Sequence, residues 1–247
     1  MLRLLCVTAH PDDEIGSFGG TLRKYAQRGV ETHVICLTPG QAATHRGGAK
    51  SEDDLSAMRR VEFAESCQLL QVSHCEVLNF PDGKLDRCNF LEVVEVLARL
   101  IREIRPHVVA TIGSEGAVTA HPDHSMASLF TTAAFHWAGR SNRFMEQLNG
   151  GLIPHRAQKL YYTTADFALP DRQPISPAPT TAIIDVGDDI VDIKIAAFAK
   201  HVSQAPLLPL FQTHIRNRGG QERFHLAAAI PLRLITVETD LFQGVTE

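Results

Sequence analysis

The sequence predicts an α/β protein with a Rossmann-like, three-layer α/β/α fold and a mostly parallel sheet. Two observations lead to this class. Short apolar runs recur along the first half of the chain, and stretches with helical apolar spacing separate them. Because parallel strands need crossover connections, which are usually helices, this alternation predicts a sheet that is covered on both faces.

The first half of the chain contains the clearest elements. Residues 90–104 place their apolar side chains on one stripe of a helix, and Pro106 follows its end. Residues 81–83 (PDG) are typical of a turn after the third strand. The predicted strands are residues 2–8, 30–38, 75–80 and 108–112, and the other predicted helices are residues 19–28 and 53–71.

The second half is less regular. Residues 160–163 and 181–186 are predicted strands, residues 188–204 are a predicted helix, and the prolines within residues 169–179 predict a loop. No internal repeat or composition change marks a boundary. We therefore expect one domain that spans residues 1–247.

The composition indicates a small-molecule partner. The formal net charge is -4 and no run of lysine or arginine occurs, which argues against binding to nucleic acid or to an anionic membrane. No segment has the length of a membrane span, and the apolar start of the chain is too short for a signal peptide, so we expect a cytoplasmic protein. The cysteines lack CxxC spacing and indicate neither a disulfide framework nor a thiolate zinc site.

Two motifs rich in histidine and aspartate follow predicted strands. Residues 10–14 (HPDDE) come directly after the first strand, and residues 121–124 (HPDH) end the loop after the fourth. Ligands bind outside the carboxyl ends of the strands in open α/β sheets. Imidazole and carboxylate together suit zinc, whose catalytic sites need only three protein ligands. Two successive carboxylates must point in different directions, so one can bind the metal while the other acts as a general base.

Each motif alone has a simpler interpretation, namely a turn with a capping aspartate. At the ends of two strands that can be neighbours, the pair of motifs favours a metal site instead. A nucleotide-binding oxidoreductase is disfavoured because the GxGxxG pattern is missing: Gly16, Gly19 and Gly20 follow the acidic cluster rather than precede it.

Residues 9–14 (AHPDDE) and 121–124 (HPDH) resemble the LmbE-like (PIG-L) family of zinc-dependent N-deacetylases. Residues 59–62 (RRVE), 194–204 and 222–224 (ERF) are also similar to stretches of that family. The resemblance implies a zinc-dependent hydrolase that removes an N-acetyl group from an amino-sugar conjugate such as an N-acetylglucosaminyl compound. It further implies a homo-oligomer.

The resemblance also implies residue roles. His10, Asp13 and His124 would bind Zn²⁺, and Asp12 would be the general base. His121, in its protonated form, would help the metal to stabilise the oxyanion.

Other roles implied by the resemblance are supporting ones. Asp123 would orient or tune His121. Glu14 would either support the site by hydrogen bonding or serve as an acid in the first turn of a helix. Arg59 or Arg60 would bind a substrate oxygen, with a solvated helix charge as the alternative for each.

The chain departs from one pattern of this family. Members that act on sugar-thiol precursors can carry a tyrosine two residues before the second motif, where this chain has Thr119. A phenolic contribution would then have to come from Tyr161 or Tyr162. His201 is expected to be a structural histidine beside the sheet.

Two alternatives to an N-acetyl hydrolase remain. One is a zinc amidase that cleaves a bulkier amide, such as that of a mycothiol conjugate, with the same metal ligands. The other is a metal-dependent carbohydrate-binding module without turnover. Retention of Asp12 and His121 argues against the module, because binding alone needs no acid/base pair.

Overall fold

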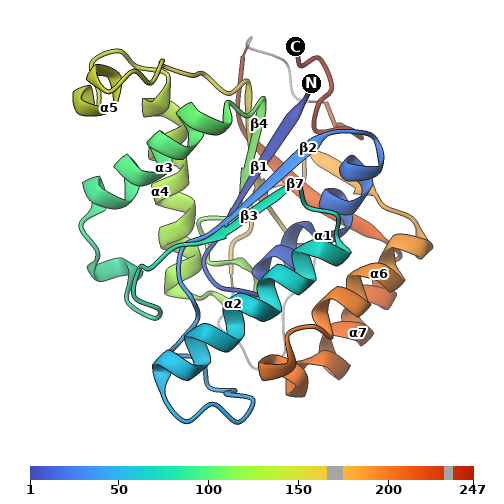
Figure 1. The fold of residues 1–247 in the computed structure, drawn as a ribbon. Coiled ribbons are helices and arrows are strands. Elements are labelled where there is room, and N and C mark those ends of the chain that lie inside the picture. The colour runs from blue at the N-terminus through green and yellow to red at the C-terminus, as the bar shows by residue number, and fades with distance from the viewer. Residues whose placement is uncertain (166–174, 231–235) are drawn as a thin grey trace.

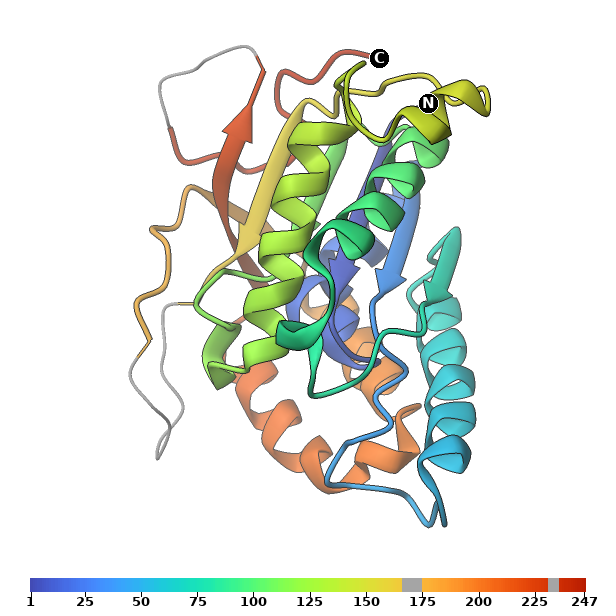
Figure 2. The ribbon, with the colours of Figure 1, turned by 90° about the vertical axis from the view of Figure 1, so that its left-hand side faces the viewer.

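The computed structural model describes residues 1–165, 175–230 and 236–247. These residues form one seven-stranded sheet with helices on both of its faces (Figures 1 and 2). The strands are β1 (Arg3–Thr8), β2 (Glu31–Cys36), β3 (His74–Val77), β4 (Val108–Thr111), β5 (Lys159–Thr163), β6 (Ala182–Asp185) and β7 (Gln221–Ala229).

The α-helices alternate with the strands through most of the described chain. Short 3-10 helices occur at Leu85–Arg87, Ala117–Thr119 and Val202–Leu207. The α-helices are α1 (Asp13–Gln27), α2 (Glu52–Leu69), α3 (Phe90–Ile104), α4 (Pro122–Ala138), α5 (Met145–Asn149), α6 (Asp188–Phe198) and α7 (Leu208–Asn217). Within the described ranges, none of these helices is long and apolar enough to cross a membrane.

The sheet is mostly parallel, as predicted. Its strand order is β3-β2-β1-β4-β5-β7-β6. Strands β1 to β5 pair in parallel, whereas β7 is antiparallel to both of its neighbours, β5 and β6. The order places β1 directly beside β4, so the ends of these two strands meet at one edge of the sheet. The Rossmann-like fold class is confirmed.

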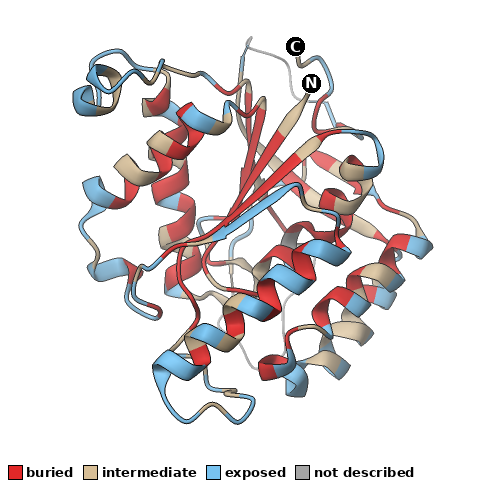
Figure 3. Ribbon diagram, in the orientation of Figure 1, coloured by how far each residue is buried: buried red, intermediate tan, exposed pale blue. Residues whose placement is uncertain are grey.

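Two hydrophobic cores lie on opposite faces of the sheet. Along β1, Leu4 and Cys6 belong to the core that is shared with α1, α2, α6 and α7, while Leu5 and Val7 belong to the core under α3 and α4. This alternation follows from the two-residue period of a strand. Figure 3 shows the central strands as the most buried part of the molecule.

Helix α1 begins earlier than the sequence predicts. It starts at Asp13 rather than at residue 19, inside the HPDDE motif. Gly16, Gly19 and Gly20 lower the helix propensity of this segment, so the sequence pattern did not indicate its first turns as helical. Gly20 is present for close packing instead, because a Cβ atom there would lie 2.8 Å from a methyl group of Val186.

The second half differs more from the prediction. The helix expected at residues 188–204 ends at Phe198 in α6, and the 3-10 helix Val202–Leu207, which contains Pro206, follows it. Strand β7 and helices α4 and α7 were not predicted. The loop expected at residues 169–179 lies partly outside the described residues.

Arg102 ties α3 to the segment that follows α4. Its side chain is 2% exposed. The guanidinium donates to the main-chain oxygens of Ala138, Arg140 and Arg143 at 3.0 to 3.1 Å and to Gln147 Oε1 at 2.8 Å. The cluster lies at the end of α4 opposite the second motif, so its contribution is to the stability of the fold.

Arg102→Met is expected to lower the free energy of unfolding by about 3 kcal/mol, because several buried carbonyl oxygens lose their donors. Arg99→Met on the same helix is the control. Arg99 pairs with Glu103 at 2.9 Å on the exposed face, and its loss should cost at most about 0.5 kcal/mol. Chemical denaturation of both variants checks the difference, and equal losses would show that the Arg102 cluster does not stabilise the fold.

Candidate metal and catalytic site

The strand order brings the two sequence motifs together. The HPDDE motif follows β1 and the HPDH motif follows β4, its neighbour in the sheet. The ring centroids of His10, His121 and His124 lie 4.8 to 5.2 Å from one another. Nitrogen atoms of these three histidines also lie close enough together to share one ion. Proximity alone therefore does not separate ligands from other roles.

Asp13 joins two of these histidines. Its Oδ1 lies 3.0 Å from His124 Nε2, and its Oδ2 lies 3.4 Å from His10 Nδ1. Burial acts to raise the pKa of Asp13, but the two histidines outweigh it and hold that pKa well below the usual range. An ionised carboxylate between two imidazole nitrogens is a donor set that suits a divalent cation such as zinc.

In His10 and His124, the ring nitrogen that points away from Asp13, here called the outer nitrogen, contacts a hydrogen-bond acceptor. His10 Nε2 lies 3.1 Å from Asp82 Oδ1 and 3.3 Å from Asp123 Oδ2, and His124 Nδ1 lies 3.1 Å from the main-chain oxygen of Gly116. These acceptors hold a proton on the outer nitrogen of each ring. His10 Nδ1 and His124 Nε2 are then the nitrogens left to bind an ion beside Asp13 once their own protons are lost, which is the arrangement that metal-binding histidines adopt.

In His121, the nitrogen that contacts the surrounding protein accepts a hydrogen bond instead of donating one. Its Nδ1 accepts a hydrogen bond from the main-chain N–H of Asp123 at 3.1 Å, so the neutral ring carries its proton on Nε2. Burial and the neighbouring His10 and His124 lower the pKa of His121. Both observations favour a neutral N–H donor at this position.

The carboxylate of Asp123 orients His10 rather than His121. Besides His10, it accepts hydrogen bonds from the main-chain N–H groups of Gly83 at 2.7 Å and Leu85 at 3.1 Å. Only the main-chain N–H of Asp123 reaches His121. This carboxylate therefore contacts His10 directly, and it influences His121 through its charge, which acts to raise the pKa of His121.

Asp82 is a site residue that the sequence analysis missed. It is 7% exposed, contacts His10, and accepts a hydrogen bond from the main-chain N–H of Ala42 at 2.7 Å. Burial acts to raise the pKa of Asp82, but the hydrogen bond from His10 lowers it. The available signal was the position of the PDG turn, which follows the third strand at the same edge of the sheet as both motifs.

Asp12 lies next to Asp13 in the chain, but its carboxylate contacts an arginine rather than the histidines. Arg59 donates to Asp12 Oδ2 at 2.9 Å. Burial is the largest influence on the pKa of Asp12 and raises it to about 6, although Arg59 acts to lower it. The pKa values of Asp12 and Asp13 thus move in opposite directions, which suits two adjacent carboxylates to different tasks.

Both arginines have positions that differ from the expected one. Arg59 is buried and also donates to the main-chain oxygens of Gly40, at 3.0 Å, and Pro11. Arg60 donates to the main-chain oxygens of Val77 at 2.6 Å and Leu78 at 3.1 Å, just after β3. Neither guanidinium lines the pocket described below. Arg59 thus contacts the proposed base and Arg60 contacts the end of β3, and substrate binding by either guanidinium stays a prediction.

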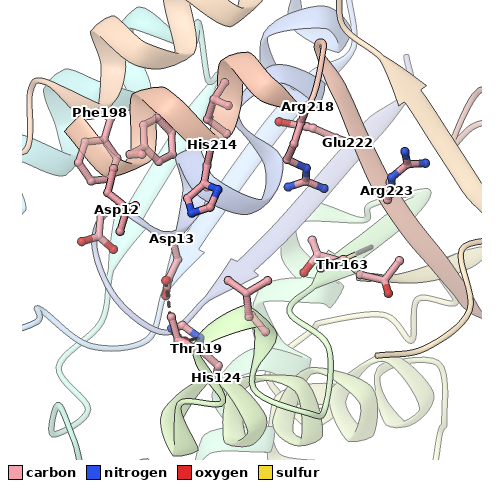
Figure 4. A pocket seen from close by; sticks show the side chains of 18 of the residues that line it. Asp12, Asp13, Thr119, His124, Thr163, Phe198, His214, Arg218, Glu222 and Arg223 are labelled. Atoms are coloured by element: carbon pink, nitrogen blue, oxygen red, sulfur yellow. Dashed lines mark hydrogen bonds and ion pairs between the residues drawn. The ribbon is translucent and has the colours of Figure 1, made fainter. Parts of the chain in front are cut away.

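A pocket of about 360 Å³ opens onto the site (Figure 4). Asp12, Asp13 and His124 line its inner end, and Thr119 lies 3.4 Å from His124 Nδ1. The second half of the chain supplies most of the remaining wall, which the sequence analysis did not identify. These wall residues include Phe198, Leu207, Leu210, Phe211, His214, Arg218 and Arg223.

No tyrosine lines this pocket among the described residues. Tyr161 is buried and its hydroxyl contacts Lys159 at 2.9 Å, while the hydroxyl of Tyr162 contacts Thr132 Oγ1 at 2.7 Å. The suggestion that either residue replaces the missing phenol beside the second motif is therefore not supported.

Comparison with known proteins identifies relatives of this chain. Residues 5–135 match the model of the PIG-L family, described as GlcNAc-PI de-N-acetylase. A 1D-myo-inositol 2-acetamido-2-deoxy-alpha-D-glucopyranoside deacetylase of Catenulispora acidiphila is 29% identical over 298 residues, covering 98% of this chain and 97% of the relative. The diacetylchitobiose deacetylase of Thermococcus kodakarensis is 30% identical over 206 residues, covering 83% of this chain and 70% of that protein.

A solved structure shares the fold. The N,N'-diacetylchitobiose deacetylase of Pyrococcus horikoshii superposes with a TM-score of 0.75 at 24% identity, over 91% of this chain and 83% of that one. The family match covers more than half of the present sequence and includes both the HPDDE and HPDH motifs. The chain therefore belongs to the PIG-L family of N-deacetylases.

Proposed function

We propose that the protein hydrolyses the N-acetyl amide of an amino-sugar conjugate, such as an N-acetylglucosaminyl compound, to acetate and the free amine. The observation that carries the proposal is the convergence of His10, Asp13 and His124 beside a second carboxylate, Asp12, with Asp12, Asp13 and His124 lining a pocket. The two curated relatives support the substrate class, since one is named as a deacetylase of an acetamido-glucopyranoside of inositol and the other of diacetylchitobiose.

We infer that the site holds Zn²⁺ through His10 Nδ1, Asp13 and His124 Nε2. Two imidazoles and one carboxylate match a ligand set of catalytic zinc sites. When bound, such an ion polarises the amide carbonyl and lowers the pKa of water toward neutrality. The anchored outer nitrogens keep both rings turned toward this position.

Asp12 is the proposed general base. Arg59 engages its Oδ2, so we assign Oδ1 to the water that attacks the carbonyl carbon. A carboxyl group with a pKa of about 6 can take a proton from water and return it near neutral pH. As the carbon–nitrogen bond breaks, this proton passes to the leaving nitrogen, which completes the amine product.

His121 is the proposed donor to the oxyanion. The neutral ring presents Nε2–H because its Nδ1 accepts the Asp123 main-chain N–H. A fixed donor beside developing negative charge stabilises the transition state more than the ground state. This role needs no protonated imidazole.

A second candidate is hydrolysis of a bulkier amide with the same residues, as in the amidases that act on mycothiol conjugates. The apolar wall formed by Leu207, Leu210 and Phe211 favours it, because this wall offers contact area well beyond what an acetyl group needs. Measurement of amine release from N-acetylated sugars and from N-acyl conjugates with larger acyl groups separates the two candidates.

The protein is expected to bind about one divalent ion per chain. Prolonged chelation should abolish amine release from N-acetylated sugars, and zinc should restore it. Elemental analysis and an amine assay on the same samples test this expectation. Undiminished turnover by the metal-free protein is the result that would exclude the proposed chemistry.

Variants of the two adjacent aspartates are expected to lose activity for different reasons. Asp13→Asn removes an anionic ligand and should weaken zinc retention, with partial recovery of activity in excess zinc. Asp12→Asn should retain zinc and lose about 10² to 10⁴-fold in kcat, because no group remains to accept the proton from water. The metal content and the kcat of both variants, measured on the same samples, distinguish the two roles. If Asp12→Asn loses the metal while Asp13→Asn retains it, the two roles are reversed.

The two histidines of the HPDH motif provide a matched pair. His121→Ala should lower kcat by roughly 10² to 10³-fold with zinc content unchanged, because it removes only a donor to the oxyanion. His124→Ala should lose the metal. Zinc stoichiometry and kcat of both variants test whether His121 is a hydrogen-bond donor and His124 a metal ligand. Loss of zinc from the His121 variant would make His121 a ligand.

A further inference from the structure

The main chain of Asp12 has an unusual conformation. Its φ is 112° and its ψ is -26°, a left-handed backbone geometry that residues with a side chain rarely adopt. Such a residue keeps this geometry only when its surroundings hold it there. The conformation decides where the Asp12 carboxylate points relative to Asp13, which begins α1.

Glu14 holds this peptide in place. Its Oε2 accepts a hydrogen bond from the main-chain N–H of Asp12 at 2.7 Å. Its Oε1 contacts Ser66 Oγ at 2.8 Å and His201 Nε2 at 2.9 Å. Glu14 and His201 are both 0% exposed. A carboxylate buried in this way depends on its donors, so Ser66 and His201 fix where Glu14 lies.

The position of His201 is itself secured by contacts between segments far apart in the sequence. The main-chain N–H and the hydroxyl of Ser203 donate to the carboxylate of Glu62 at 2.7 and 2.6 Å. Gln204 Nε2 donates to the main-chain oxygen of His45 at 3.0 Å. The RRVE segment of α2 and residues 201–204 therefore dock onto each other, and this docking places the His201 ring against Glu14.

We propose that His201 is a positioning residue for Asp12 and acts through Glu14. This inference rests on the proposed function of Asp12 as general base. His201 Nε2 donates to Glu14, Glu14 holds the Asp12 N–H, and this hydrogen bond stabilises the strained backbone that aims the Asp12 carboxylate. His201 does not line the pocket, so it acts on Asp12 from behind rather than on the substrate.

His201→Leu tests the proposal because leucine retains much of the volume but cannot donate. Measured per bound metal ion, kcat is expected to fall by about 10²-fold while KM changes little, since the substrate pocket is intact. His201→Gln places an amide N–H near the position of Nε2 and is expected to recover most of this loss. Ser66→Ala removes the other donor to Glu14 Oε1 and should give a smaller fall in kcat of the same kind.

The chain offers a matched control in His33. This buried histidine of β2 also contacts a glutamate, with its Nε2 3.1 Å from Glu31 Oε1, but Glu31 begins the strand at the end opposite the site. His33→Leu should change stability without changing kcat per bound metal. Equal falls in kcat for the His33 and His201 variants would overturn the proposal.

Hydrogen exchange at the Asp12 amide gives a readout that does not depend on turnover. Exchange should be slow in the unmodified protein, faster by about tenfold or more in His201→Leu, and close to the original rate in His201→Gln. Unchanged exchange together with unchanged kcat in the His201→Leu and Ser66→Ala variants would refute the positioning role. Absence of amine release by the unmodified protein from every N-acetylated sugar would instead refute the proposed function, and the exchange measurement would still test the contact chain.

Discussion

The constraint on which the site depends is the amount of negative charge at one edge of the sheet. Ionised carboxylates are costly to bury unless cations or N–H donors surround them. Each carboxylate here has such a partner, either an arginine, a histidine or a main-chain N–H group. The proposed divalent cation would add to this balance. The five carboxylates are those of Asp12, Asp13, Glu14, Asp82 and Asp123.

The same constraint explains why the histidines differ in role. His10 meets carboxylates on both edges of its ring, so its outer nitrogen donates and its inner nitrogen can bind a cation. His121 meets a main-chain N–H instead and becomes a donor toward the site. The tautomer of each ring therefore follows from the group behind it, and the chemistry of the site is set one layer away from the reacting atoms.

The sequence allowed the fold class and the position of the site to be predicted, because both depend on local patterns. Apolar runs with crossover helices indicate a parallel sheet, and the two motifs follow strands that become neighbours in it. The partners of Asp123, Asp82 and Arg59 could not be predicted, since each contact joins segments that are distant in the chain. The first turn of α1 was hidden by glycines whose purpose is tertiary packing.

The pocket wall could not be predicted for a related reason. Helix α7 and strand β7 supply much of the wall. Neither element contains a sequence motif that indicates a binding or catalytic role. Their side chains acquire a role only when the sheet places them opposite the HPDDE segment. The family match, which ends at residue 135, likewise covers the segments that bear the metal and catalytic candidates but not this wall.

The candidate catalytic groups and most of the pocket wall thus come from different stretches of the chain, and these stretches meet at the contact between Glu14 and His201. Substitutions in α7 would change the pocket wall and leave the histidines and aspartates of both motifs unaltered. Residues 201–204 limit that freedom, because they immediately precede α7 and are docked against α2. The wall can therefore vary independently of the two motifs only as far as residues 201–204 keep their contacts with α2.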